Sequence, residues 1–447
     1  MGKLYEMVSS PCLPIVLCTF MWSCYHVGIM KVIGVYLEDI SNDLGTTATD
    51  LGLALGLLTL FCNFPTVIIA ALYRRRSIRR KLLICGACLP PLGMALISMA
   101  TSNLHIAISL SIAGLGICIQ MLNCIMALHL VAKENYNVLY GLGVTGYGVG
   151  MVLFPLIAEF LRGTYGWRGG LLILSALMAH IIPCAAKINL DVYKTNKQLN
   201  GSDSNYLALP DSEEVCPEGC ERKTNREGRA RDQSGINTTQ VGVWRRITTI
   251  IRQSDFFVDP YFNAAHVVNI SFSMVYACWH SFIVPHALER GLSIRYTIIL
   301  TFIASIGNII SRTAVGILTK NIFHPTDVYI FATLVSIVSL LCDVYFVNCV
   351  AMIMTSCFSA MSIGGRAALE ILYMRDRASP EKFDVALAVD KFCFGIGAVL
   401  GGYLGGMIAD RFSSFEATFR MLPVIETIVL IPMLILRCNP KEIPHSS

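Results

Sequence analysis

Charged residues are scarce in this sequence. Asp, Glu, Lys and Arg make up 15% of its 447 residues, whereas they make up about 25% of an ordinary soluble domain. Hydrophobic residues make up 54%, and the mean hydropathy is +0.60, which one soluble core of this size could not accommodate. The composition therefore excludes an ordinary soluble protein. No basic face is interleaved with exposed aromatic residues, so we expect no nucleic-acid partner.

The patterns typical of enzymes and metal sites are also missing. Most of the 17 cysteines stand inside apolar runs, where cysteine behaves as a small hydrophobic residue. Cys216 and Cys220 stand in a polar segment, but no second ligand pair accompanies them, which argues against a zinc site. No apolar run carries paired carboxylates, a nucleophile beside a base, or histidines at metal-ligand spacing. We expect no metal, no cofactor and no catalytic activity.

Long apolar runs, by contrast, recur along the whole chain. A membrane-spanning helix needs about 20 mostly apolar residues, and runs of this kind form two sets of six. The sequence predicts an all-α membrane protein with twelve transmembrane helices in two pseudo-symmetric six-helix halves. The predicted spans are residues 12–36, 51–72, 82–101, 105–131, 139–161, 169–187, 260–284, 294–318, 327–347, 349–372, 384–408 and 418–437.

Polar segments set the predicted domain boundaries and the topology. The halves are residues 1–187 and 256–437, and 438–447 form a tail. Residues 188–255 are rich in charge and poor in apolar side chains, so we expect a disordered loop. The loop after the second span reads YRRRSIRRK, and short loops rich in Lys and Arg face the cytosol. We therefore expect a multi-pass protein of the cell membrane with both termini and the middle loop in the cytosol.

A short repeat supports the division into halves. Residues 150–160 read GMVLFPLIAEF and residues 401–411 read GGYLGGMIADR, so that Glu159 and Asp410 stand 251 residues apart at equivalent places. Duplicated halves are a hallmark of transporter folds. The same two spans carry glycines at a spacing that lets helices approach closely in lipid. We assign a helix-packing role to Gly146, Gly150, Gly397 and Gly401.

Ionisable residues inside the predicted spans are the main indication of function, because each costs about 2.5–3.5 kcal/mol to insert at a helix centre. Lys31 and Arg312 stand within about two turns of a span end, so they could also extend to the interface. Arg366 and Glu370 stand four residues apart and could neutralise each other. The remaining pair is Asp390 and Lys391, of which Lys391 is a candidate for packing or for extending to the interface.

A binding interpretation of these charges begins with Arg312 and Lys31. A guanidinium can hold a carboxylate through two parallel hydrogen bonds, and a buried lysine can lose its proton more readily than an exposed one. His26 stands five residues before Lys31 in the same span. The candidate apolar walls are Tyr25, Trp279 and Phe394, each of which also fits plain packing.

Several motifs resemble the monocarboxylate transporter family of the major facilitator superfamily. They are YGWRGGLLILSAL at residues 165–177, GLGVTGYGVG at the start of the fifth span, DPYF before the seventh span, FIVPHALERGLS at its end, and SRTAVGIL around Arg312. The resemblance covers all twelve spans. It implies a major-facilitator-type bundle, transport of a monocarboxylate with a proton, and a single-span accessory protein as a further partner.

The resemblance also implies roles for individual residues. Lys31 matches the family lysine implicated in proton and substrate binding, and Arg312 matches the arginine regarded as the carboxylate anchor. Proton-coupled members carry an aspartate four residues before this arginine, whereas this sequence has Asn308. An amide does not take up a proton at physiological pH, so this departure bears on coupling and substrate rather than on the fold.

We therefore expect a secondary-active or facilitative carrier of a small monocarboxylate or a related organic solute. The predicted substrate-binding residues are Lys31, Arg312, Asn308 and Arg366. The predicted proton-coupling residues are Lys31, Asp390 and His26. Two alternatives stay open, namely a facilitated carrier of zwitterionic or aromatic amino-acid-like solutes and a transport-dead receptor or scaffold on the same fold.

Overall fold

The computed structural model describes residues 12–73, 76–132, 136–188, 260–321, 323–377 and 383–438. Regular secondary structure within these ranges is α-helical. The predicted loop and tail lie outside them, apart from their first residues. The helices are α2 (Cys12–Val35), α3 (Leu37–Leu44), α4 (Ala48–Asn63), α5 (Thr66–Tyr73), α6 (Arg76–Ser98), α7 (Asn103–Ala132), α8 (Tyr136–Val144), α9 (Gly146–Met178), α10 (Ile181–Ala186), α13 (Pro260–Glu289), α14 (Ile294–Asn321), α15 (Pro325–Tyr345), α16 (Cys349–Arg377), α17 (Phe383–Phe412) and α18 (Phe415–Cys438).

These helices make twelve crossings in the described residues. Ten stretches are long and apolar enough to cross a membrane. One of them, Leu139–Ala186, is 48 residues long and breaks at Gly166, whose φ of 64° is left-handed, so it supplies two crossings. The helices α4 and α5 together supply one more, with a break around Phe64 and Pro65. The predicted twelve-helix bundle is therefore confirmed.

One expectation about the connections was wrong. The basic segment after the second span is not a loop throughout, because α6 already begins at Arg76. Lys and Arg are good helix formers, so a basic stretch can extend a helix beyond its apolar run. The fifth and sixth spans are separated at Gly166, where the backbone leaves the helical conformation, and this residue lies in the predicted connection between them.

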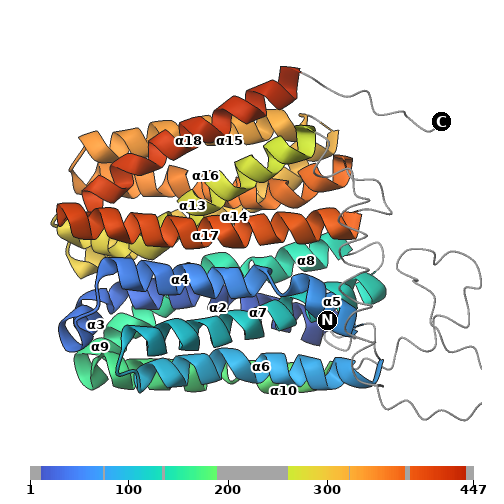
Figure 1. The fold of residues 1–447 in the computed structure, drawn as a ribbon, viewed down its shortest axis with the longest axis horizontal. Helices are drawn as coiled ribbons and strands as arrows, with labels where there is room; N and C mark the ends of the chain where they lie inside the picture. The colour runs from blue at the N-terminus through green and yellow to red at the C-terminus, as the bar shows by residue number, and fades with distance from the viewer. Residues whose placement is uncertain are drawn as a thin grey trace, which may run out of the picture.

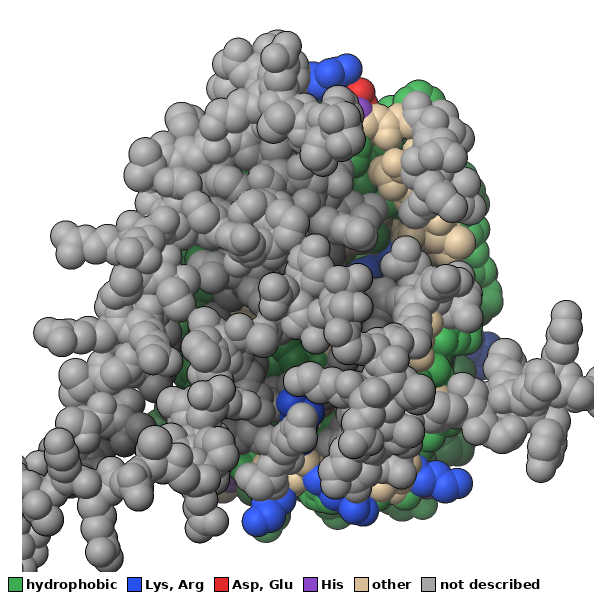
Figure 2. Space-filling model, turned by 90° about the vertical axis from the view of Figure 1, so that its right-hand side faces the viewer, with side chains coloured by type: hydrophobic (Ala, Val, Ile, Leu, Met, Phe, Trp, Pro, Cys, Tyr) green, Lys and Arg blue, Asp and Glu red, His purple; other side chains and the backbone are tan. Residues whose placement is uncertain are grey.

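The helices run side by side along the long axis of the molecule (Figure 1). Those coloured blue to green occupy the lower part of the view, and those coloured yellow to red occupy the upper part. We call the end at which α2 begins and α18 finishes the terminal end, and the opposite end the far end. Basic side chains line the lower rim of the terminal end (Figure 2). The helix α6, whose sequence begins RSIRRK, starts at this end (Figure 1).

The core lies along α2 and α13. In the apolar windows of these two helices, 72% and 78% of residues are buried inside the protein, against 33% in α15. A helix that is apolar on all sides and buried on all sides belongs to the centre of a bundle. The outer face of α15 exposes Phe331, Val338 and Tyr345, as a lipid-facing helix would.

Glycines bring α9 against α2. A Cβ atom at Gly146 would meet the backbone carbonyl oxygen of Phe20, and one at Gly150 would meet that of Cys24. Only hydrogen fits at either position, so the backbones approach as closely as small-residue packing in lipid allows.

The same contact recurs in the second half of the chain. A Cβ atom at Gly397 would meet the carbonyl oxygen of Ile270, and one at Gly401 would meet that of Met274. The glycines are displaced by 251 residues from those of α9, and their partners on α13 by 250 from those on α2. A duplicated half would produce this repetition.

Candidate functional site

Lys31 is buried at the centre of the bundle. Its side chain on α2 is inaccessible to solvent, and Nζ donates a hydrogen bond of 2.8 Å to the carbonyl oxygen of His280 on α13. Nζ also lies 4.6 Å from the centre of the Trp279 ring. Both contacts join the first half of the chain to the second, and both partners are neutral groups.

Arg312 is held on α14 by its own helix and by α9. Its Nε donates a hydrogen bond of 2.9 Å to Asn308 Oδ1, and the guanidinium carbon lies 4.8 Å from the centre of the Tyr147 ring. The amide orientation of Asn308 is set on its other side, where Nδ2 donates to the carbonyl oxygen of Ala360 at 3.1 Å. Asn308 thus directs its side-chain oxygen toward Arg312 and accepts the hydrogen bond from Nε.

Aromatic rings lie between the two cations. Tyr147 packs edge-on against Trp22 and His26 of α2, at 5.8 and 5.9 Å between ring centres. On the α13 side, His280 packs against Tyr276 at 4.4 Å. The charge of Arg312 acts on both His26 and His280, so the aromatic groups and the two cations belong to one region.

Several polar atoms of this region have no hydrogen-bond partner in the described part of the chain. They are Nε1 of Trp22, both ring nitrogens of His26 and Nδ1 of His280, and all three side chains are at most 4% exposed. A buried polar atom without a partner costs about 1–3 kcal/mol, and such atoms are rare in folded proteins. Their occurrence on one wall makes it a candidate site for a polar ligand.

The cations inside the spans differ in whether an acidic side chain lies beside them. Arg366 pairs with Glu426 at 2.5 Å between Nη1 and Oε2, and Lys391 pairs with Glu370 at 3.0 Å. Within the described residues, Lys31 and Arg312 contact only neutral groups. Their charges are therefore left uncompensated in this part of the chain, with Lys31 fully buried and Arg312 half-buried.

The expected neutralisation of Arg366 by Glu370 along α16 was wrong. Arg366 reaches across to Glu426 on α18, and Glu370 reaches across to Lys391 on α17. An acid four positions away on the same helix is a poorer partner for a guanidinium than an acid on a neighbouring helix that offers it two oxygens. Glu426 escaped the sequence analysis, although it is the one acid between residues 417 and 437.

Asp390 lies apart from the other two proton-coupling candidates. His26 and Lys31 share α2, whereas Asp390 on α17 accepts a hydrogen bond of 2.6 Å from Asn269 Nδ2 of α13. Asn269 also donates to Glu370 Oε1 at 3.1 Å. The structure thus forms a second polar cluster from α13, α16 and α17, and Asn269 was not identified from the sequence.

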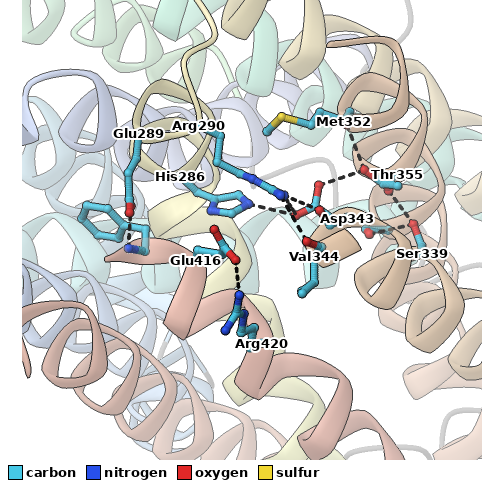
Figure 3. A network of polar contacts seen from close by, with 12 residues as sticks. His286, Glu289, Arg290, Ser339, Asp343, Val344, Met352, Thr355, Glu416 and Arg420 are labelled. Atoms are coloured by element: carbon cyan, nitrogen blue, oxygen red, sulfur yellow. Dashed lines mark hydrogen bonds and ion pairs between the residues drawn. The ribbon is translucent and has the colours of Figure 1, made fainter. Parts of the chain in front are cut away.

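A third polar network ties the far ends of α13, α15, α16 and α18 together (Figure 3). Asp343 accepts hydrogen bonds from His286 Nε2 and Thr355 Oγ1, both at 2.9 Å, and forms an ion pair with Arg290. The His286 ring stacks on Phe419 at 3.9 Å. These partners are 12 to 133 residues apart, so no local pattern pointed to them. Their mutual satisfaction indicates a structural clamp.

Comparisons with known proteins place this arrangement among transporters. The sequence model of the Major Facilitator Superfamily matches residues 16–369 and 281–447. Monocarboxylate transporter 6 of Mus musculus is 22% identical over 401 residues, which cover 88% of this chain and 80% of that one. Monocarboxylate transporter 13 of Rattus norvegicus is 21% identical over 408 residues, covering 91% and 84%. A mutant of the nucleoside transporter NupG superposes with a TM-score of 0.67 at 9% identity, covering 96% of this chain and 100% of that one.

Proposed function

This chain belongs to the Major Facilitator Superfamily, and we propose that it carries a small monocarboxylate or a related small organic solute across the plasma membrane by alternating access. As a multi-pass membrane transporter similar to monocarboxylate transporters, it is not an enzyme. The substrate class, the coupling ion and the residues are our proposals.

The observation that carries the proposal is the missing counter-ion of Lys31 and Arg312. A buried charge without a partner is destabilising by several kcal/mol, and each of the other two cations described above has an acid beside it. An organic anion is the partner that would compensate both charges. Because Lys31 belongs to the first half and Arg312 to the second, one bound carboxylate would also draw the halves together.

The chemistry of the surrounding groups refines the substrate class. The Nε of Arg312 is used by Asn308, which leaves the two terminal nitrogens to hold a carboxylate in parallel. Trp22, His26 and His280 would pair with hydroxyl, keto or amide groups of the solute. The fork of Arg366 is occupied by Glu426, so we assign substrate contact to Lys31, Arg312 and Asn308.

A second candidate is a facilitated carrier of zwitterionic or aromatic amino-acid-like solutes. It is favoured by the aromatic walls and by the unpartnered ring nitrogens of His26, because a neutral imidazole has one nitrogen that can accept a hydrogen bond from an ammonium group. A transport-dead receptor on this fold is separated from both carriers only by an uptake measurement. A panel of radiolabelled monocarboxylates and amino acids, tested at two pH values in cells that lack endogenous uptake, decides among the three.

Variants of Arg312 test the anion site itself. Arg312→Gln should lower uptake of an anionic substrate roughly ten- to hundred-fold, because a hydrogen bond to a charged group contributes about 1.5–3 kcal/mol. Arg312→Lys keeps the charge but loses the fork, so it should also transport poorly. The matched control is Arg295→Gln, an exposed arginine on the same helix. Normal uptake by Arg312→Gln at equal surface level would reduce the arginine to an interfacial anchor.

The topology belongs to the same proposal. The basic start of α6 supports placing the terminal end in the cytosol, together with both termini and the middle loop. A single-span protein is a further proposed partner. An epitope inserted between residues 202 and 233 should be reached by antibody only after permeabilisation. Labelling of intact cells at that epitope would reverse the orientation.

A further inference from the structure

Two carboxyl groups meet in the interior between α13, α16 and α17. One amide nitrogen, Asn269 Nδ2, donates both to Asp390 Oδ1 at 2.6 Å and to Glu370 Oε1 at 3.1 Å. The two acid side chains are therefore adjacent, since one amide nitrogen contacts an oxygen of each. Asp390 is 1% exposed and Glu370 is 8% exposed.

The second oxygen of Asp390 is left without a hydrogen bond. Oδ2 has no partner within the described residues, and its nearest cation, Lys391 Nζ, is 4.0 Å away. The same nitrogen lies 3.0 Å from Glu370 Oε1, so the lysine is committed to Glu370. A fully buried carboxylate oxygen in this position is short of one donor.

The charges of this cluster do not balance when every group has its usual ionisation. Arg366 and Glu426 neutralise each other on the adjoining turn, and within the described residues Lys391 is the one cation that pairs with Glu370 and Asp390. One negative charge is in excess, in a place where an unpaired charge is strongly disfavoured. Two carboxylates that share one buried site do not both ionise.

In the described part of the chain, no other Lys or Arg side chain forms an ion pair with this cluster. Tyr329 of α15 and Cys393 of α17 are within electrostatic reach of Asp390, and Tyr140 of α8 is within reach of Lys391. His266, one turn before Asn269 on α13, makes no hydrogen bond in the described part of the chain. From α18, the cluster receives Glu426, already paired, and the apolar Met433.

A small cavity of about 20 Å³ adjoins the acids. It is lined by Asn269, Glu370 and Asp390 on its polar side and by Phe272 and Met433 among its apolar residues. A cavity of this size has room for about one water molecule. A single water would bring a proton to Asp390 Oδ2, whereas a metal cation would have to compete with Lys391 for the same oxygens.

We infer that Asp390 and Glu370 share one proton and form the proton-binding site of this carrier. The inference rests on the proposed function and adds the location of its coupling ion, since Asn308 places an amide rather than a carboxyl group beside Arg312. Taking up the proton turns one carboxylate into a carboxylic acid and removes the excess negative charge. The protonated carboxyl group then donates a hydrogen bond to the other carboxyl group.

A chain of contacts connects this proton site to the anion site. Lys391 Nζ lies 5.5 Å from the centre of the Phe394 ring, and Phe394 packs against Tyr276 at 5.3 Å. Tyr276 packs on His280, whose carbonyl oxygen accepts from Lys31. Protonation weakens the attraction between Glu370 and Lys391, so the change in charge reaches a residue that contacts the wall of the anion site.

Infrared spectroscopy tests the shared proton without any need for a substrate. Purified full-length protein at neutral pH should show the carbonyl stretch of a buried carboxylic acid, shifted by exchange into deuterated water. Asp390→Asn and Glu370→Gln should each lose this band. Glu159→Gln, in which the substituted acid pairs with Arg162, should keep it. A parent without the band, or both variants with it, would overturn the inference.

Proteoliposomes with a trapped pH dye test the coupling, with radiolabelled pyruvate as the probe. Inward pyruvate flux through the parent should acidify the lumen. Asp390→Asn should lose this acidification and the dependence of uptake on external pH, while pyruvate–pyruvate exchange continues. Persistent acidification in Asp390→Asn refutes the coupling role. A parent that shows the infrared band but carries neither pyruvate nor another monocarboxylate refutes the proposed function and leaves the shared proton established.

Discussion

At the residue scale, Arg366 and Glu426 compensate each other's charge in the protein interior. Both side chains are fully buried, and they share two hydrogen bonds of 2.5 Å. Glu426→Gln should destabilise the protein by about 3–5 kcal/mol, because it leaves a guanidinium buried without its counter-ion. Thermal unfolding in detergent measures this loss. Glu416→Gln on the same helix, which breaks the exposed pair with Arg420, should cost no more than about 1 kcal/mol.

A double substitution separates charge from packing at this pair. Arg366→Met combined with Glu426→Leu removes both charges together, so it should recover most of the stability that Glu426→Gln loses. If the double variant is as unstable as the single one, the pair contributes through its shape rather than through the compensation of charge.

Asn308 decides which partner Arg312 has in the absence of substrate. Asn308→Asp would place a carboxylate at the oxygen that now lies 2.9 Å from Arg312 Nε, and the two would pair. Because this carboxylate competes with the substrate and is removed by protonation, uptake by the variant should rise more steeply with external acid than uptake by the parent. Uptake measured across a pH series checks this. Parallel pH profiles for the two proteins would contradict it.

Individual charges could be located from the sequence because an ionisable residue inside an apolar run is rare and expensive. Lys31, Arg312 and Asp390 stood out for that reason. Their partners could not be located, because a partner is chosen by helices that meet only in the folded bundle. Glu426 stands 60 residues from Arg366, and Asn269 stands 121 residues from Asp390.

At the scale of the helix, the four glycines of α9 and α17 set how closely neighbouring backbones approach. Gly146→Leu and Gly401→Leu would each drive a side chain into a carbonyl oxygen, of Phe20 and Met274 respectively, so both should lower folding yield and uptake. Surface expression and uptake are measured together. Gly163→Leu is the matched control on α9, because a Cβ atom there meets nothing within 4 Å. Wild-type behaviour of both glycine variants would show that the contacts are incidental.

The existence of the helices followed from the apolar runs, whereas their ends and breaks did not. A run of 20 apolar residues has few alternatives to a spanning helix in lipid. The break at Gly166 depends on one residue with a left-handed backbone, which glycine permits but does not require. The helical start of α6 depends on propensity in a segment whose charge pointed to a loop.

At the scale of the whole molecule, the two sets of helices are joined at the far end by Asp410. From α17, its Oδ1 accepts from the backbone nitrogen of Ala48 at 3.0 Å and its Oδ2 from that of Thr49 at 2.8 Å. These are the first residues of α4, where a negative charge also favours the helix dipole. Glu159, the equivalent acid of the repeat, instead pairs with Arg162 of its own helix. The two copies of the repeat thus differ, because the acid of the second copy contacts the other set of helices whereas the acid of the first copy contacts its own helix.

The proposed alternating access requires this far-end contact to open, so Asp410→Asn should favour the conformation that is open there. The substitution removes the negative charge and at least one of the two hydrogen-bond acceptors. Together these contribute about 1 kcal/mol, which corresponds to about a five-fold change in the population ratio of the two conformations. Double electron–electron resonance between labels at Asn42→Cys and Arg295→Cys measures the separation of the far ends. The background lacks the exposed Cys85 and Cys88 and the cysteines of the middle loop, Cys216 and Cys220. The long-distance fraction should grow in Asp410→Asn and stay unchanged in Glu159→Gln, because Glu159 holds only its own half. An unchanged distribution in Asp410→Asn would mean that the glycine contacts between α4 and α17, such as Gly52 against Gly402, close the far end without the carboxylate.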